Sequence, residues 1–198
     1  MWFENNTIMK KLLVLVICLL MTGSIYAQKH LTFKGVPIDG TLKEYTEAMV
    51  NAGFTFEETE NGVSTLSGDF AGYKDCQIKV STLKNCDIVS HVDVFFSSSI
   101  NWSPILNDYE KLKGMLTKKY GKSTKCIERF SRPADSDGSK MRALFNDECE
   151  WYTTFSNEYG EIKVSIVKGR FILDGRVCIS YYDKVNSNIV NQAAMDDL

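Results

Sequence analysis

The chain has 198 residues, of which 44% are hydrophobic and 24% charged, and its net charge at pH 7 is −2. A globular chain of this length can bury a substantial core in one domain without disulfide bridges. The near-neutral charge, with no basic block, excludes the electrostatic footprint of a nucleic-acid-binding protein.

The first 27 residues have the pattern of a signal peptide. Lys10 and Lys11 supply a positive start, residues 12–21 form an unbroken apolar run, and an imperfect Ala-x-Ala pattern ends at Ala27. The apolar run is shorter than the ~20 residues that a membrane-spanning helix needs. We therefore expect export followed by cleavage, and no membrane span.

Two alternatives concern the same segment. The eight residues before Met9 are not typical of a signal start, so translation could begin at Met9. A lipoprotein signal would use Cys18, but the bulky Ile17 in front of it disfavours lipidation. The mature chain, 28–198, is expected to be one periplasmic or secreted domain. Its net charge is −3, because cleavage removes two lysines and one glutamate from a chain of charge −2.

Five cysteines remain in the mature chain: Cys76, Cys86, Cys126, Cys149 and Cys178. Five cannot all pair within one chain, and none stands in the Cys-x-x-Cys spacing of zinc or redox sites. Each lies in or beside a β-like run, so buried free thiols are the favoured interpretation. Cys126 and Cys149 are the pair best placed for a disulfide, because their runs are expected to be hairpin neighbours.

The first part of the mature chain predicts one helix followed by four strands. Cap residues end at Thr41, apolar residues recur at helical spacing from Leu42 to Val50, and Gly53 ends the helix. Turn residues separate four β-like runs at 54–58, 63–70, 76–82 and 88–96. We assign 41–98 to a first unit.

The second part repeats this order. Ser103-Pro104 opens a helix, because proline suits the first helical position, and Gly121 ends it. The β-like runs that follow are 124–130, 149–155, 161–167 and 176–182. The second unit spans 103–185, and the tail 186–198 is either a short helix or a frayed end.

The two units read as copies of each other. Residues 77–81 (QIKVS) match 161–165 (EIKVS), and Tyr45 on the first helix matches Tyr109 on the second. The offset grows from 64 residues at the tyrosines to 84 at the matched strands. Most of this growth lies in 131–147, a polar stretch that the first copy lacks and that we predict to be a loop.

The pattern predicts an α+β fold of two tandem helix-plus-four-strand units, with an antiparallel sheet and helices on one face. Alternate side chains of a strand share a face. The face expected to pack on the helices carries Ile78, Val80, Val92, Val94, Phe96, Ile162, Val164, Ile166, Val177, Ile179 and Tyr181. The opposite face, which we call the open face, carries Lys79, His91, Asp93, Phe95, Tyr152, Lys163, Ser180 and Tyr182.

This element order resembles the tandem architecture of β-lactamase inhibitory proteins and the single unit of outer-membrane assembly lipoproteins of the BamE/SmpA type. The segments 33–42 (FKGVPIDGTL), 68–73 (GDFAGY) and 137–141 (DGSKM) resemble a family of small exported bacterial proteins of uncharacterised function. The resemblance implies the domain and its export. It implies no activity and no site residue.

His91 and Asp93 are two residues apart, so both project from the open face. A His–Asp pair can orient a nucleophile, and Cys86 or Ser90 is near in sequence. Ser90 shares its parity with the core-facing residues, however, and no oxyanion-type glycine turn adjoins. An ordinary surface histidine beside a carboxylate is therefore favoured, and a small hydrolase using His91 is an alternative.

Phe95, Tyr152 and Tyr182 on the open face predict a recognition surface, because aromatic residues are enriched in binding patches. The alternative is that aromatics simply suit strands and that the tail covers them.

Asp135 and Asp137 precede Gly138 in the polar stretch. A calcium loop of the EF-hand type needs three acidic or amide ligands at alternating positions before its glycine, and two are present. A solvated loop is favoured, and no metal is expected.

These observations predict an exported, non-catalytic protein that binds a protein or an envelope component through the open face and the 131–147 loop. The candidate binding residues are His91, Asp93, Phe95, Tyr152, Tyr182, Asp135 and Asp137. No cofactor is expected. The alternatives are a small-molecule carrier with a pocket between sheet and helices, and the hydrolase using His91.

Overall fold

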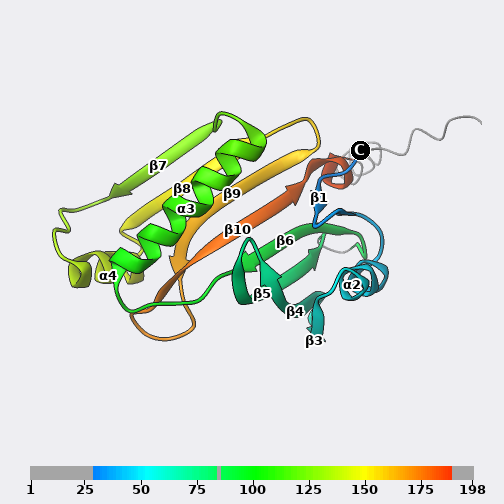
Figure 1. Ribbon diagram of the computed structural model, residues 1–198, viewed down its shortest axis with the longest axis horizontal. Helices are drawn as coiled ribbons and strands as arrows, with labels where there is room; N and C mark the ends of the chain where they lie inside the picture. The colour runs from blue at the N-terminus through cyan, green and yellow to red at the C-terminus, as the bar shows by residue number, and fades with distance from the viewer. Residues whose placement is uncertain (1–28, 84–85, 189–198) are drawn as a thin grey trace, which may run out of the picture.

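A computed structural model describes residues 29–83 and 86–188. The predicted signal peptide with its cleavage boundary, and residues 189–198 of the predicted tail, lie outside these ranges. The described chain is α+β, with one large antiparallel sheet, one short hairpin and helices (Figure 1).

The large sheet has eight strands in the order β3-β4-β5-β6-β10-β9-β8-β7. They are β3 (Thr55–Glu60), β4 (Val63–Phe70), β5 (Tyr73–Thr82), β6 (Val89–Phe95), β7 (Lys125–Phe130), β8 (Cys149–Ser156), β9 (Gly160–Lys168) and β10 (Gly175–Asp183). The other named elements are β1 (Thr32–Phe33), β2 (Val36–Pro37), α2 (Leu42–Asn51), α3 (Trp102–Tyr120) and α4 (Asp137–Phe145). The predicted order of a helix and four strands, given twice, is confirmed.

The last strand of each unit lies at the centre of the sheet. β6 and β10 pair antiparallel, with Val94 opposite Ile179, so the two four-stranded units join edge to edge. β3 and β7, the first strand of each unit, form the two outer edges of the sheet.

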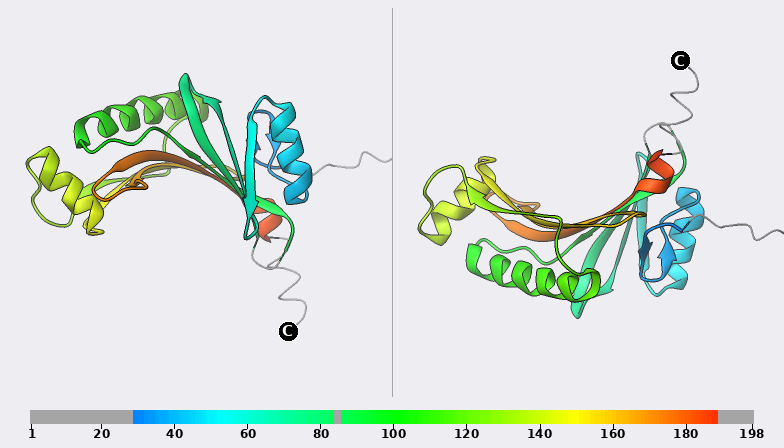
Figure 2. Two further views of the ribbon diagram at one scale, coloured as in Figure 1. Left: turned by 90° about the horizontal axis from the view of Figure 1, so that it is seen from below. Right: turned by 90° about the horizontal axis from the view of Figure 1, so that it is seen from above.

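The helices lie on one face of the sheet. The Thr46 hydroxyl of α2 donates to Ser64, and the Tyr109 hydroxyl of α3 lies 2.7 Å from that of Thr153. By strand register, Ser64 and Thr153 share a face with the buried residues of the central strands. Figure 2 shows α3 lying along one side of the curved sheet.

Local sequence explains where these helices begin. Thr41 and Glu44 form a capping box at the start of α2, each accepting a hydrogen bond from the other's backbone N–H. On α3, buried residues recur at helical spacing and end with Leu116 near the predicted stop at Gly121.

The 131–147 stretch is not the loop that its polar sequence predicts, because it contains α4. Ser136 caps this helix with Ser139, while Met141 and Leu144 are buried on its inner side. A Cβ on Gly175 would lie 2.7 Å from Leu144 and 3.1 Å from Ile105 of α3. The polar residues that suggested a loop therefore form a helix cap, and α4 packs on the same face as α3.

The predicted disulfide is corrected by strand register. Cys126 lies opposite Thr153, and Cys149 lies opposite Phe130. Four residues separate the two positions along the strands, about 13 Å at ~3.3 Å per residue, whereas a bridge needs Cα atoms within about 7 Å. All five described cysteines are free, but only Cys76 and Cys178 are buried; Cys86 and Cys149 are partly buried and Cys126 is exposed.

Candidate functional site

The open face holds five of the seven predicted binding residues. His91, Asp93 and Phe95 of β6 pair with Tyr182, Ser180 and Cys178 of β10, respectively. Tyr152 of β8 reaches the same face through its pairing with Ser165, which in turn lies opposite Cys178. None of the helices α2, α3 and α4 covers this face, and the five side chains on it are partly exposed.

Asp93 is the centre of a polar cluster on this face. Its Oδ1 accepts a 2.6 Å hydrogen bond from the Ser180 hydroxyl and lies 3.0 Å from His91 Nε2. Burial alone would raise the pKa of Asp93, but the hydrogen bond and charge of His91, with the Ser180 hydroxyl, lower it below its ordinary value. The carboxylate is therefore fixed in its charged form.

Cations lie over the aromatic rings beside this cluster. His91 stacks on Tyr182 with 4.1 Å between ring centroids. Lys163 lies 5.6 Å from the Tyr182 ring and 6.0 Å from the Tyr152 ring, and Lys125 lies 5.4 Å from Tyr152. These distances are within the range of cation–π attraction, so strands β6 to β10 present a continuous band of aromatic and basic groups.

Arg176 extends the band toward the β9–β10 turn. Its guanidinium lies 4.0 Å from the Phe95 ring and donates to Gln77 at 3.4 Å, while its buried Nε has no hydrogen-bond partner. Burial, together with the charge of Arg170, lowers the pKa of Arg176 below its ordinary value. A depression of about 340 Å³ adjoins this guanidinium.

The cluster does not have the geometry of a hydrolytic site. The Ser180 hydroxyl donates to Asp93, so the carboxylate lies between this hydroxyl and His91. A nucleophile should contact the base itself, and no such contact to His91 occurs within the described residues. Ser90 lies on the helix-covered face, and burial raises the pKa of the Cys178 thiol to about 12.

The two predicted binding aspartates of the 131–147 stretch, Asp135 and Asp137, lie apart from this band. Asp137 accepts hydrogen bonds from the Ser103 N–H at 3.1 Å and from its hydroxyl at 2.9 Å. It thereby caps α3, whose own N-cap residue, Asn101, makes no side-chain bond. Asp135 is exposed, and no group of three potential metal ligands occurs in 29–83 and 86–188.

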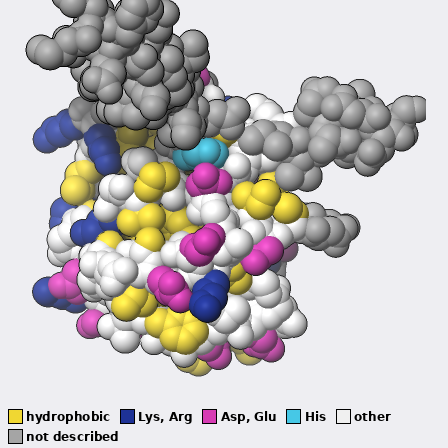
Figure 3. All heavy atoms as spheres, turned by 90° about the vertical axis from the view of Figure 1, so that its right-hand side faces the viewer, with side chains coloured by type: hydrophobic (Ala, Val, Ile, Leu, Met, Phe, Trp, Pro, Cys, Tyr) yellow, Lys and Arg dark blue, Asp and Glu magenta, His cyan; other side chains and the backbone are white. Residues whose placement is uncertain are grey.

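A groove lies between α2 and strands β3 and β4, and the carrier alternative expected a pocket between sheet and helices. Its volume is about 770 Å³, and its lining residues are Leu42, Lys43, Thr46, Glu47, Val50, Asn51, Phe56, Thr59, Ser64 and Asp87. Val50 is 43% exposed and Phe56 is 46% exposed, although Phe56 points to the helix-covered side of the sheet. Figure 3 views the α2 end of the molecule, where hydrophobic and acidic side chains intermingle.

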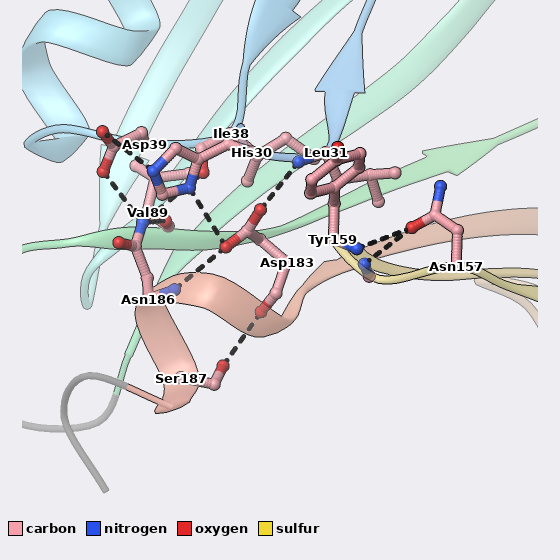
Figure 4. Close-up of polar contacts among 11 residues, drawn as sticks. His30, Leu31, Ile38, Asp39, Val89, Asn157, Tyr159, Asp183, Asn186 and Ser187 are labelled. Carbon is pink, nitrogen blue, oxygen red and sulfur yellow. Dashed lines mark hydrogen bonds and ion pairs between the residues drawn. The ribbon is translucent and has the colours of Figure 1, made fainter. Parts of the chain in front are cut away.

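A second polar cluster ties the two ends of the described chain together (Figure 4). Asp183 accepts hydrogen bonds from the backbone N–H groups of Leu31, at 2.8 Å, and Asn186, at 3.0 Å, and lies 3.3 Å from His30. The Asn186 amide donates to Asp39 at 2.9 Å and to the Val89 carbonyl at 3.2 Å. The groups of this cluster satisfy one another, which indicates a structural role.

Comparison with known proteins adds no family. No protein-family model, no curated protein and no solved structure matches the chain. Among the described helices, none is long and apolar enough to cross a membrane. Function must therefore be argued from the described surfaces themselves.

Proposed function

We propose that the protein is an exported, non-catalytic binding protein that holds a partner protein, or another envelope component, on the open face. One observation carries this proposal. Four basic residues of this face form no ion pair with a carboxylate of the described chain: Lys79, Lys125, Lys163 and Arg176. Each of them lies over an aromatic ring of the same face.

The charges on this face favour an acidic partner. Some basic residues of the described chain are paired: Lys113 with Glu128, Lys168 with Asp147 and, at the β7–β8 edge of this face, Arg129 with Glu150. Asp93, the carboxylate at the centre of the open face, is already bound by His91 and Ser180. The unpaired cations are thus available to carboxylates of a partner, while the rings beside them supply apolar contact area.

The 131–147 segment has a structural role in this proposal and is not part of the binding surface. The sequence suggested that it would share a binding surface with the open face. α4 packs instead with α3, and Asp137 caps the N-terminus of α3. We therefore assign recognition to the open face and leave Asp135 and Asp137 out of it.

Charge reversal in a capture experiment tests the proposal. The bait is the mature protein and the source is envelope extract of the host. The variant Lys163→Glu should capture at least about tenfold less of any specific partner, because one attraction becomes a repulsion. Lys118→Glu, an exposed position on α3, is the matched control and should capture normally. Equal capture by wild type and Lys163→Glu would refute the open face as the binding surface.

A second candidate function is carriage of a small molecule in the α2 groove. The volume of about 770 Å³ is within the range of ligand pockets, and the lining combines apolar Leu42, Val50 and Phe56 with polar side chains. Native mass spectrometry of protein purified from its host should then show a retained ligand. Val50→Trp should displace it, whereas Met115→Trp, at an equally exposed position outside the groove, should not. Purified protein without bound mass would exclude this function.

A further inference from the structure

Exposed hydrophobic side chains gather at one end of the molecule. Of eight large hydrophobic residues exposed in the described chain, five surround the β9–β10 turn: Ile100, Phe145, Phe171, Ile172 and Leu173. Phe171 is 77% exposed and Ile172 is 79% exposed. We call these five residues the hairpin end. Val50 and Phe56 line the α2 groove, and Met115 stands alone on α3.

Backbone contacts bring the members of the hairpin end together. Ser99, next to Ile100, exchanges two 2.9 Å backbone hydrogen bonds with Gly175 at the start of β10. The ammonium of Lys168, the last residue of β9, lies 5.6 Å from the Phe145 ring. Ile100 and Phe145 thus lie beside the two strands from which the turn projects.

The turn is held in a fixed conformation. Asp174 Oδ1 accepts from the Phe171 N–H at 3.0 Å, and the Asp174 carbonyl accepts from the Gly169 N–H at 2.9 Å. A Cβ on Gly169 would lie 2.1 Å from the same carboxylate, so only glycine fits there. Leu173 has a φ of +62°, which is uncommon for a bulky residue. Ordering this turn with its apolar side chains exposed to water costs free energy. Such a turn therefore indicates that the exposed side chains contact something.

The charges of the turn itself favour an anionic surface. Asp174 is buried in the turn, and Asp147 is paired with Lys168. Arg170, at the base of the tip, is exposed and forms no ion pair with the described residues. Arg170 is therefore exposed beside the apolar tip, while Asp174 is enclosed and Asp147 is paired. Two exposed carboxylates, Glu57 and Asp75, lie on the other side of the depression that Arg170 and Phe171 line.

We propose that the hairpin end inserts into the interfacial region of an anionic lipid bilayer. Consecutive side chains of a tight turn diverge, so a protein pocket would contact few of them, whereas a fluid bilayer surface accepts all of them. Apolar side chains enter the headgroup–acyl boundary while Arg170 contacts lipid phosphates, which is how peripheral proteins bind such surfaces. This surface adjoins the band of the open face at the depression beside Arg176, but the proposal does not depend on the proposed partner.

Co-sedimentation with vesicles tests the proposal. The mature protein should bind vesicles of phosphatidylcholine with phosphatidylglycerol, and bind pure phosphatidylcholine vesicles less. The double variant Phe171→Ser, Ile172→Ser should bind at least about tenfold more weakly, since two exposed apolar side chains are lost. Met115→Ser is the control at an exposed apolar position elsewhere and should bind like wild type. Circular dichroism checks that each variant is folded.

A fluorescence probe gives a second readout. Ile172→Trp should show a blue-shifted emission when phosphatidylglycerol vesicles are added, and Arg170→Glu in that background should weaken the response. An unshifted emission, or wild-type protein that sediments with neither vesicle, would overturn the proposal. So would a double variant that binds vesicles normally but loses a protein partner. Lys163→Glu should keep vesicle binding, so failure of the open-face proposal leaves this one standing.

Discussion

The two units of the sheet use the same strand pattern but are covered differently. In the first unit, α2 has 10 residues and leaves the groove over β3 and β4. In the second unit, α3 has 19 residues and is joined by α4. Phe56 on edge strand β3 remains 46% exposed, whereas Glu128 on edge strand β7 is bonded to Tyr109 and Lys113 of α3.

This difference shows what decides whether a unit is closed. The strands alternate in the same way in both units, so the sheet supplies equal faces to be covered. Helix length and the inserted α4 then fill one half and leave space in the other. The second unit is accordingly the more fully covered, and the first has room for a ligand beside its helix.

The largest expected effect of a substitution lies in the second unit, whose sheet is covered by two helices. Trp102 is 1% exposed and packs edge-on against Trp151, with ring centroids 5.2 Å apart. Trp102→Ala should lower the free energy of unfolding by about 3–5 kcal/mol. Phe56→Ala in the first unit should cost under about 1 kcal/mol, since the ring is already half exposed. Urea denaturation measures both, and similar losses would remove the contrast between the units.

The second effect is a pH dependence that Glu128, a carboxylate of the second unit, contributes to stability. Burial alone would raise the pKa of Glu128, but hydrogen bonds from Lys113, Cys126 and Tyr109 lower it below its ordinary value. A carboxylate with a lowered folded pKa stabilises the protein above its unfolded pKa of about 4.3, and loses this contribution as pH falls through the folded value.

Glu128→Gln should therefore reduce stability at pH 7 by roughly 1.5 kcal/mol and flatten the acid limb of the stability curve. Unfolding at pH 7, 5, 4 and 3 compares the variant with wild type. Other carboxylates titrate in both proteins and cancel in the difference. A difference that stays constant across this range would contradict the assigned role of the Glu128 charge.

The smallest effect concerns the join between α3 and α4. Asp137→Ala removes the acceptor of both Ser103 hydrogen bonds and should cost about 1 kcal/mol, a typical value for a lost helix cap. Asp135→Ala, two residues away and exposed, should cost almost nothing. Thermal unfolding distinguishes the two variants, and equal melting temperatures would show that Asp137 does not cap α3.

Much of the fold is predictable from the sequence because it depends on local pattern. Strand alternation assigned the helix-covered face correctly: Ile78, Val80, Val164 and Ile179 are all buried. The same alternation predicted that the other face carries His91, Asp93, Phe95, Tyr152 and Tyr182. β4 has the predicted bounds, since turn glycines mark both of its ends.

The remaining features depend on distances that a pattern does not contain. Asp137 and Gly138 suggested a turn, yet Met141 and Leu144 could form a helix because Ile105 and Gly175 offer them a site. The disulfide prediction failed because adjacency of two strands does not set their register. The α2 groove depends on the length of one helix relative to the sheet. Whether Lys79 has an ion-pair partner depends on the positions of all carboxylates around it, which a strand pattern does not contain.

The position of β10 has a consequence for how the molecule is made. This strand is the last of the sheet in the chain, but it lies between β6 and β9, which it joins through continuous backbone pairing. Until residues 175–183 arrive, β6 has an unpaired edge, and such edges recruit other chains. The eight-stranded sheet is therefore complete only when β10 pairs with both β6 and β9. Folding of either unit alone leaves a strand edge unpaired, and the resulting intermediate is prone to aggregate.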